Sequence, residues 1–543
     1  MRVLGINAVF DDPAAALVVD GEIVAAAEEE RFSRRRHGKQ PVPFSTWELP
    51  VAAARWCLKQ AGLTAADLDA VGYSYDPWLM SEASGNMEGL DGDWEDLRTL
   101  YAQRTPQFLT TALPGLDPET VRFVRHHVAH AASTALASPY SHSAVLVVDG
   151  RGELTSMLAG QDRDGKLDIL ATQDLPHSLG LLYENLTEYL GFARSDVDMV
   201  TDMSSYGTPR FAERLRERVY ACSEGGFRTE PIDFGDFAPA RINGDGFEPE
   251  HADLAASVQC VLEEVLLDLV RWLRNRTDAD NLCMAGGVAL NCVANSKIFA
   301  TGGFDNVWVQ PAAGDSGTAL GAALAVAAEA GEQITPMSTA ALGRGWTDDQ
   351  IAAELDAAAV RYERPDDVAA CVGDALADSR IVGWFQGRAE FGPQALGGRS
   401  LLADPRDIAN QHRLSNITGR EQFRPVAPMV LADRAAEIFS GGPIPSPYML
   451  FVHEVAPRWR MRIPAVTHVD GTARIQTIDT DQPRLHATVV RFYERTGVPV
   501  VANTGFNTAG RPRVDSPRDA LECFGSAPID MLAIGPYVVR RAH

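Results

Sequence analysis

Residues 144–153 of this chain have the sequence AVLVVDGRGE, an apolar run that ends in an acidic and glycine-rich turn. An apolar run of this length, bounded by a turn, predicts a buried β-strand. Two short segments follow at 156–160 and 167–172, and the Asp-Gly-Lys sequence at 164–166 between them predicts a hairpin. The stretch therefore predicts a strand with Asp149 at its carboxyl end, followed by two antiparallel strands.

A similar unit occurs at the start of the chain. Residues 2–6 are a short apolar run, and residues 14–32 predict a hairpin with an Asp-Gly turn. Residues 282–291, LCMAGGVALN, predict a strand, a Gly-Gly turn and a helix, and residues 314–323, GDSGTALGAA, predict a loop that begins a helix. A unit that occurs twice predicts a duplicated α/β core. The order of these turns matches an actin-like ATPase, in which two related halves clamp a nucleotide; the alternative is an unrelated α/β enzyme with ordinary turns.

The length of 543 residues favours two domains, because one ordinary core does not grow this large. The composition changes around residues 331–344, so we predict a first domain at 1–335 and a second at 345–543. A helix predicted at 348–355 and strands predicted at 380–385 and 500–502 indicate that the second domain is also α/β.

The composition limits the partners. With 49 basic and 73 acidic residues, the net charge is -24, which repels nucleic acid and attracts cationic ligands; a merely solubilising acidic surface is the ordinary alternative. No apolar run is long enough to span a membrane, and the first six residues do not resemble a secretory signal. Seven scattered cysteines without a Cys-x-x-Cys pair argue against a zinc ribbon and favour a reducing cytoplasm. We therefore expect a cytoplasmic protein with a small-molecule substrate and neither a nucleic-acid nor a membrane partner.

Two histidines have a spacing that suits metal binding. His126 and His130 are four residues apart, which on a helix places both imidazoles on one face. The neighbouring His127 points about 100 degrees away. Asp149 follows a predicted strand, and Asp315 lies in a glycine-rich loop. Two histidines with one or two carboxylates suit iron(II). Two solvent-exposed histidines are the alternative.

These segments, together with several others, resemble the O-carbamoyltransferase family along nearly the whole chain. The further segments are EEERFSR at 28–34, HHVAHA at 126–131, SLGLLY at 178–183, GRAEFGP at 387–393, REQFRP at 420–425, THVDGTAR at 467–474 and NTGFN at 503–507. The first domain resembles the TsaD-like domain of that family, and the second resembles its YrdC-like domain. The opening residues are most similar to members that modify aminoglycosides, for which a cationic aminosugar would be the acceptor.

The resemblance implies a two-step reaction. The second domain would join carbamoyl phosphate and ATP into carbamoyl adenylate, and the first, with an iron ion, would transfer the carbamoyl group to a hydroxyl. It implies that His126, His130, Asp149 and Asp315 are the metal ligands and that Asp11 and Asp12 act at the acceptor. The candidate residues for binding nucleotide or carbamoyl phosphate are Gly286, Gly287, Asn291, Arg388, Arg420, Arg424, Arg474 and Asn503.

Five positions depart from the family pattern. Asp11 replaces a histidine, and a carboxylate with a reference pKa of about 3.9 is a weaker base for an alcohol than an imidazole at about 6.5. The other four replace, in order, a lysine, an arginine, a lysine and a serine: Met199, Gln394, Thr418 and Gly505. No lysine follows Lys297, so only arginine could supply the lost charge in the second domain, and arginine is not equivalent to lysine at a phosphate. Each lost contact typically costs about 2.7–4 kcal/mol of transition-state stabilisation.

Three hypotheses follow from this sequence. The chain is an active O-carbamoyltransferase with rearranged catalytic groups, a repurposed non-haem iron oxygenase, or a non-catalytic paralogue that binds a ligand or a partner. The second rests on the two-histidine, one-carboxylate iron centres of oxygenases. The sequence does not predict an oligomeric state.

Overall fold

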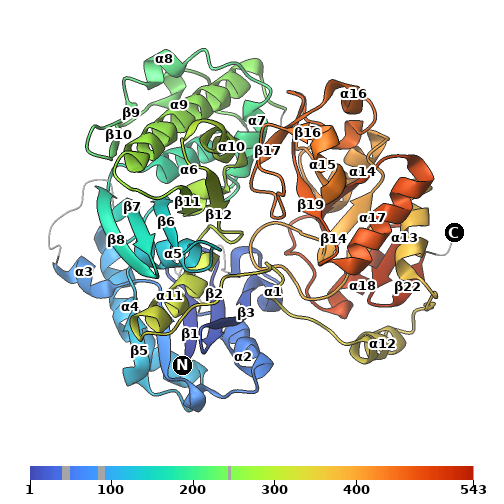
Figure 1. Ribbon diagram of the computed structural model, residues 1–543, viewed down its shortest axis with the longest axis horizontal. Helices are drawn as coiled ribbons and strands as arrows, with labels where there is room; N and C mark the ends of the chain where they lie inside the picture. Colours follow the sequence, from blue (N-terminus) through green and yellow to red (C-terminus); the bar gives the residue numbers. More distant parts are fainter. Residues whose placement is uncertain (39–48, 83–91, 243–245, 542–543) are drawn as a thin grey trace. The chain divides into compact units, whose positions relative to one another are not determined.

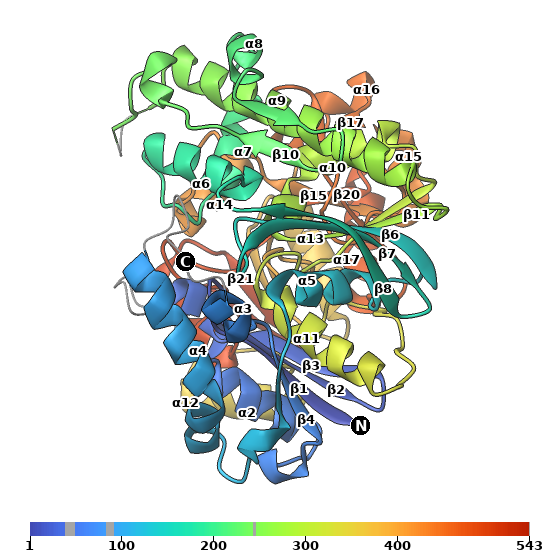
Figure 2. The same cartoon turned by 90° about the vertical axis from the view of Figure 1, so that its left-hand side faces the viewer.

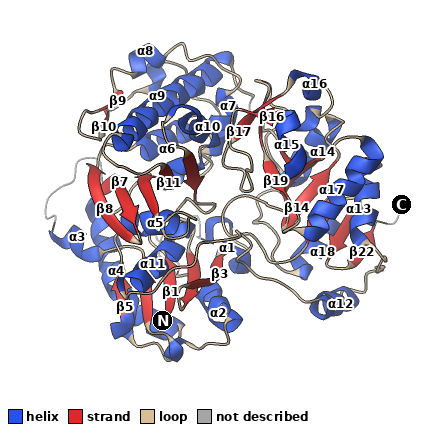
Figure 3. Cartoon of the chain, in the orientation of Figure 1, coloured by secondary structure: helices blue, strands red, loops and turns tan. Residues whose placement is uncertain are grey.

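The computed structural model describes residues 1–38, 49–82, 92–242 and 246–541. The chain divides into two compact units, Met1–Thr339 and Ala340–His543. This division lies inside the interval that the sequence leaves between the two predicted domains. Figure 1 labels the elements along the chain, and Figure 3 separates its helices from its strands.

The first unit contains two five-stranded sheets with the same topology. In each, three antiparallel strands are followed by two strands that pair in parallel on the other side of the first strand, giving the orders β3-β2-β1-β4-β5 and β8-β7-β6-β11-β12. This repetition confirms the duplicated α/β core. The strands, with the separate β9-β10 ribbon, are β1 (Arg2–Asn7), β2 (Ala14–Val19), β3 (Glu22–Glu28), β4 (Ala70–Tyr73), β5 (Val121–Phe123), β6 (His142–Val148), β7 (Thr155–Arg163), β8 (Lys166–Asp174), β9 (Val219–Ala221), β10 (Phe227–Thr229), β11 (Asn281–Ala285) and β12 (Asn306–Val309).

Two helices connect the sheets. The helix α11 (Ser316–Glu329) packs on β1, β2 and β4, the helix α5 (His126–Ala135) packs on β6, β7 and β11, and the two helices pack on each other (Figure 2). Glycine permits the close approach, because a Cβ atom at Gly321 would lie 1.7 Å from the carbonyl oxygen of Ala129. The small residues expected at 314–323 therefore serve helix packing. The other helices of this unit are α1 (Glu30–Ser33), α2 (Val51–Gln60), α3 (Pro77–Glu82), α4 (Gly92–Ala112), α6 (Leu179–Tyr189), α7 (Asp198–Ser204), α8 (Ala212–Leu215), α9 (Pro249–Arg274) and α10 (Cys292–Thr301).

The second unit is built on a mixed seven-stranded sheet with the order β19-β15-β20-β14-β13-β21-β22, beside a small β16-β17-β18 sheet. Its strands are β13 (Val382–Phe385), β14 (Arg399–Ala403), β15 (Ala427–Leu431), β16 (Phe439–Ser440), β17 (Val452–Val455), β18 (Thr472–Arg474), β19 (Gln476–Ile478), β20 (Val500–Gly505), β21 (Met531–Ile534) and β22 (Tyr537–Arg540). Its helices are α12 (Asp348–Ala357), α13 (Val368–Ala377), α14 (Ala409–Thr418), α15 (Ala432–Ile438), α16 (Pro457–Arg460), α17 (Pro483–Thr496) and α18 (Pro517–Ser526). The helix and the two strands predicted in this unit are confirmed as α12, β13 and β20. No helix among the described residues is both long and apolar enough to cross a bilayer.

Candidate functional site

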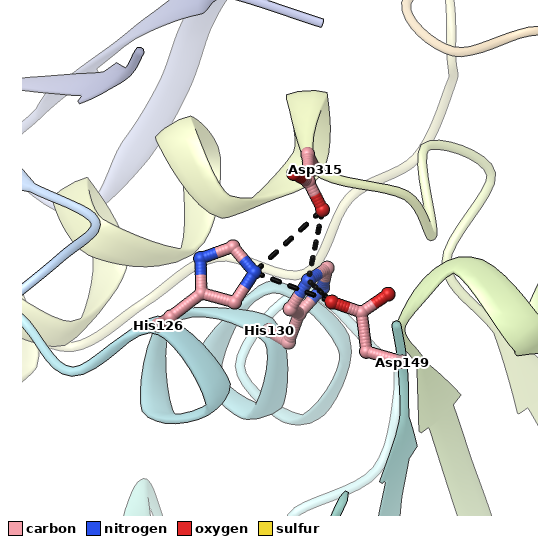
Figure 4. Close-up of side chains that lie close together, drawn as sticks. All are labelled: His126, His130, Asp149 and Asp315. Atoms are coloured by element: carbon pink, nitrogen blue, oxygen red, sulfur yellow. Dashed lines mark hydrogen bonds and ion pairs between the residues drawn. The ribbon is translucent and has the colours of Figure 1, made fainter. Parts of the chain in front are cut away.

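Four side chains from three separate segments meet in the first unit (Figure 4). His126 and His130 lie one turn apart on α5, Asp149 follows β6, and Asp315 immediately precedes α11. Their ligand atoms all lie within 4.8 Å of one another. The Nε2 atoms of the two histidines are 3.3 and 3.4 Å from Asp149 Oδ2, and each is 3.6 Å from Asp315 Oδ1.

The other histidine of this helix faces elsewhere. His127 Nδ1 lies 2.7 Å from the Thr155 hydroxyl, and burial lowers the pKa of His127 to about 3. The cluster therefore contains His126 and not His127, whereas metal binding by these side chains stays a prediction. Both His126 and His130 are fully buried, so the alternative of two exposed histidines is wrong.

Backbone groups fix the orientation of three of these side chains. The amide of Gly287 donates to Asp149 Oδ1 at 2.8 Å, and the amide of Asp11 donates to Asp315 Oδ2 at 2.9 Å. His126 Nδ1 lies 3.2 Å from the carbonyl oxygen of Ser74. Each carboxylate therefore keeps one oxygen toward the centre, which is the arrangement expected around metal ligands.

The charges of the cluster fit a divalent cation. Burial lowers the pKa of His126, but Asp149 and Asp315 outweigh burial and raise it well above its usual value. Burial also raises the pKa of Asp149, but the two imidazoles hold it well below its usual range. Buried His130 Nε2 has no hydrogen-bond partner among the described residues. Two nitrogen and two oxygen donors with this geometry suit zinc, iron or manganese.

The loop after β1 is contacted by a histidine that the sequence did not predict, His37. Asn7 Nδ2 donates to the carbonyl oxygens of Asp11 at 2.7 Å and Asp12 at 3.1 Å, which fixes this loop beside Asp315. His37 Nδ1 lies 2.8 Å from Asp12 Oδ1. Burial lowers the pKa of His37, but Asp12 outweighs burial and the pKa is raised to about 9. The side chain of Asp11 itself is exposed.

A half-buried carboxyl group on α6, that of Glu184, was also missed. The hydroxyl of Ser178, which caps this helix, donates to Gly150 O at 2.6 Å, so the helix begins beside Asp149. A Cβ atom at Gly150 would lie 2.8 Å from Glu184 Oε1, and Arg194 Nε donates to Glu184 Oε2 at 2.6 Å. Burial raises the pKa of Glu184 to about 7. Only the fold brings this residue next to the cluster.

The predicted nucleotide residues of the first unit lie at the turn after β11. Gly286 has a positive φ of 92°, and its neighbour Gly287 contacts Asp149 as described above. Asn291 caps α10 and donates to Gln259 Oε1 at 2.8 Å. Met199, one of the substituted positions, is half-buried on α7. The glycines therefore lie beside the cluster of His126, His130, Asp149 and Asp315, whereas their contact with a nucleotide stays a prediction.

In the second unit, Arg513, which the sequence did not predict, contacts two of the substituted positions, Gln394 and Gly505. Arg513 donates to the carbonyl oxygens of Gln394 and Gly392. A Cβ atom at Gly505 would lie 3.3 Å from Arg513 Cδ and 2.8 Å from Asn507 Oδ1, so these side chains occupy the space of a larger residue. Near them, Arg420 donates to the Thr504 hydroxyl at 3.1 Å.

The remaining predicted residues differ in their surroundings. Asn503 donates to Ala395 O at 2.7 Å, and its buried Oδ1 has no partner among the described residues. Arg388 Nε donates to Gly343 O at 2.9 Å, so this guanidinium binds backbone. Thr418 is buried and donates to Leu414 O within α14. Arg424 is buried and Arg474 is half-buried. Phosphate binding by these residues stays a prediction.

Fold and site define the class of this protein: a two-unit α/β protein with a buried two-histidine, two-aspartate cluster in its duplicated unit. Comparison with known proteins gives the family. The models for the carbamoyltransferase N-terminus and C-terminus match residues 109–324 and 373–541. The chain is 36% identical to nodulation protein NolNO of Sinorhizobium fredii over 98% of its own length and 80% of the relative. It is 31% identical to nodulation protein U of Rhizobium tropici over 94% of its own length and 92% of the relative. The chain therefore belongs to the carbamoyltransferase family, as the resemblance indicated.

Solved structures show weaker likeness. The activator of a 2-hydroxyisocaproyl-CoA dehydratase from Clostridium difficile is 14% identical, with a TM-score of 0.34, and covers 62% of this chain and 100% of its own. HypF of T. kodakarensis is also 14% identical, with a TM-score of 0.33, over 62% of this chain and 49% of its own. Because these scores are low, the description of the fold depends on its own strand order.

Proposed function

We propose that this protein transfers a carbamoyl group from carbamoyl phosphate to a hydroxyl group of a small molecule, with ATP as the activating co-substrate. Membership of the carbamoyltransferase family over nearly the whole chain supports this proposal. The observation that carries it is the cluster of His126, His130, Asp149 and Asp315, whose members all lie inside the segment matched by the N-terminal family model.

The second unit would activate the carbamoyl donor. Water first hydrolyses carbamoyl phosphate to carbamate and phosphate. A carboxylate oxygen of carbamate then attacks the α-phosphorus of ATP, and pyrophosphate leaves as carbamoyl adenylate forms. Such a step needs cations against the polyphosphate charge. Arg420, Arg424 and Arg474 are our candidates, and the unpartnered oxygen of buried Asn503 is a further polar contact. We propose that these residues partly offset the missing lysine and arginine.

The first unit would carry out the transfer. His126, His130, Asp149 and Asp315 would bind a divalent cation, for which we propose iron(II), and this ion would polarise a carbonyl or phosphoryl oxygen. The Gly287 and Asp11 amides would fix the two carboxylates while the ligands bind. Asp11 and Asp12 would orient the acceptor hydroxyl, in place of the histidine that the family pattern has at position 11.

The acceptor class is a finer proposal. We extend the function to natural-product biosynthesis in the cytoplasm, and we retain an aminosugar as one acceptor to test. The net charge of -24 supports a cationic acceptor, since an acidic protein attracts cations.

Neither alternative hypothesis has a specific observation in its favour. An iron oxygenase of the two-histidine, one-carboxylate type keeps three protein ligands, whereas four converge here. Two of its relatives are named nodulation proteins, and the family models are those of carbamoyltransferases. A direct assay of pyrophosphate release distinguishes a non-catalytic paralogue from an enzyme.

The assay is pyrophosphate release from ATP by the full, metal-loaded chain. We expect release that depends on carbamoyl phosphate and falls at least tenfold in Arg420→Gln, because a contact to a charged group is lost. Arg518→Gln is the matched control, since that side chain is 78% exposed and pairs only with Glu522 in the described structure. No release by this chain, while a family member with the usual lysine and arginine is active, would refute the proposal.

A further inference from the structure

Two arginines lie against the aromatic ring that packs on His126, one of the candidate metal ligands. Arg98 on α4 and Arg151, two residues after Asp149, each place the guanidinium carbon 5.2 Å from the centre of the Phe10 ring. The same ring meets the His126 imidazole edge-on, with 5.0 Å between centroids. The Phe10 ring therefore contacts both cations and one of the candidate metal ligands.

The described residues around this pair leave an excess of positive charge. Both guanidiniums bind one carboxylate, Glu95, and the Arg151 Nη2 to Glu95 Oε1 distance is 2.6 Å. Glu153, the other nearby acid, accepts from the backbone amides of Asp76 at 2.8 Å and His126 at 2.9 Å. Two cations thus share one counterion.

Both arginines also have donors that remain unused. The Nε atoms of Arg98 and Arg151 are buried and have no hydrogen-bond partner among the described residues. The side chains are 12% and 21% exposed, so water only partly replaces a partner. Buried donors are nearly always paired, so these two Nε–H groups are available to an anionic acceptor.

We infer that Arg98 and Arg151 form a binding site for an oxyanion, a phosphate or carboxylate group of a small molecule that binds at the metal cluster. The planar guanidinium matches both of these groups through paired hydrogen bonds. Under the proposed function, on which this inference rests for its source, the oxyanion is either the phosphate of the carbamoyl donor or a carboxylate on the acceptor.

This site changes the expectation for the acceptor. Charges separated by more than roughly 8–10 Å of solvent are largely screened, so the local arginines outweigh the net charge of -24 at this position. An ammonium group of an aminosugar is repelled here and is accommodated only away from Phe10. An acceptor with an acidic group is favoured.

Ligand binding to the full, metal-loaded chain tests the site without turnover. The probes are inorganic phosphate and glucuronate, with glucose as the neutral comparison, and the readout is the dissociation constant from titration calorimetry. We expect Arg98→Gln to weaken at least one of the two anions about tenfold and to leave glucose unaffected. Arg98→Lys, which keeps the charge, should lose no more than about threefold. Arg104→Gln is the matched control, since Arg104 is an exposed arginine of the same helix.

The two anions distinguish the sources. A loss confined to phosphate supports the donor as the source, and a loss with glucuronate supports an acidic acceptor. Unchanged binding of both anions by Arg98→Gln, in a variant that keeps its metal content, overturns the inference, as does an equal loss in Arg104→Gln. Because no ATP is present, an absence of carbamoyl transfer leaves this result unaffected.

Discussion

Gly321 controls the distance between the two helices that bring the candidate metal ligands together. A Cβ atom at this position would lie 1.7 Å from Ala129 O and 2.9 Å from Ser133 N, both in the backbone of α5. Ordinary van der Waals contact begins at 3.4 Å, so Gly321→Ala requires the helices to separate by about 1.7 Å. Backbone cannot rotate away as a side chain can.

The expected loss of stability follows from two opposing effects. Overpacking in a tight core costs about 1–3 kcal/mol, and this overlap is at the upper end. Replacing glycine by alanine inside a helix stabilises the folded state by about 1 kcal/mol, because less backbone entropy is lost on folding. The net destabilisation should therefore be about 2 kcal/mol. The same shift moves α5 away from Asp315, at the start of α11, and lengthens the two 3.6 Å distances to the imidazoles.

Urea unfolding and metal content after gel filtration check this prediction. Gly525→Ala in α18 is the control, since its Cβ atom would have nothing within 4 Å and it should gain about 0.5–1 kcal/mol. A Gly321→Ala protein that is as stable as the unchanged chain and binds as much metal would show that the helix crossing is not rigid, and the packing argument would be wrong.

Three further predictions concern single side chains. His130→Ala should abolish stoichiometric metal binding by elemental analysis, whereas His142→Ala, a half-buried histidine outside the cluster, should not. Burial raises the pKa of Glu184 from 4.5 to about 7, so its contribution to stability is complete below pH 4.5 and is lost as the pH rises through 7. In Glu184→Gln, the unfolding midpoint should depend less on pH over this range. An unchanged slope of midpoint against pH would contradict the assignment. Arg513→Gln should loosen the 392–394 loop and raise the KM for carbamoyl phosphate about tenfold with a smaller change in kcat, which steady-state kinetics would measure.

Local patterns in the sequence predicted the strands, the turns and the helix that carries two histidines, because these features depend on short-range information. Alternation and glycine turns determine strands, and the four-residue spacing of His126 and His130 determines a shared helix face. The carboxylates Asp149 and Asp315 lie at the ends of predicted elements, so the family resemblance was needed only to group them with the histidines.

Long-range contacts explain what was missed. His37 meets Asp12 from 25 residues away, and Arg151 meets Glu95 from 56 residues away. No periodicity in the sequence links such pairs, since their approach depends on how the loops pack on the sheets. The same limit applies to Arg388, whose charge suggested phosphate binding although its guanidinium contacts the carbonyl oxygen of Gly343.

The substituted positions affect chemistry more than structure. Position 11 contacts Asp315 through its backbone amide, which any residue except proline supplies. An aspartate in place of the family's histidine therefore keeps that contact and removes only the imidazole. The Thr418 hydroxyl donates to the carbonyl oxygen of Leu414, and the Arg513 side chain fills the space beside Gly505. Neither position therefore needs a ligand to satisfy its polar groups or to fill its space. Because these three positions are satisfied within the chain, we expect that the four-residue cluster and the proposed activation of the carbamoyl donor can be altered independently. A chain with full metal content and slow pyrophosphate release is therefore the expected result of these substitutions, and it would assign the deficit to the second unit.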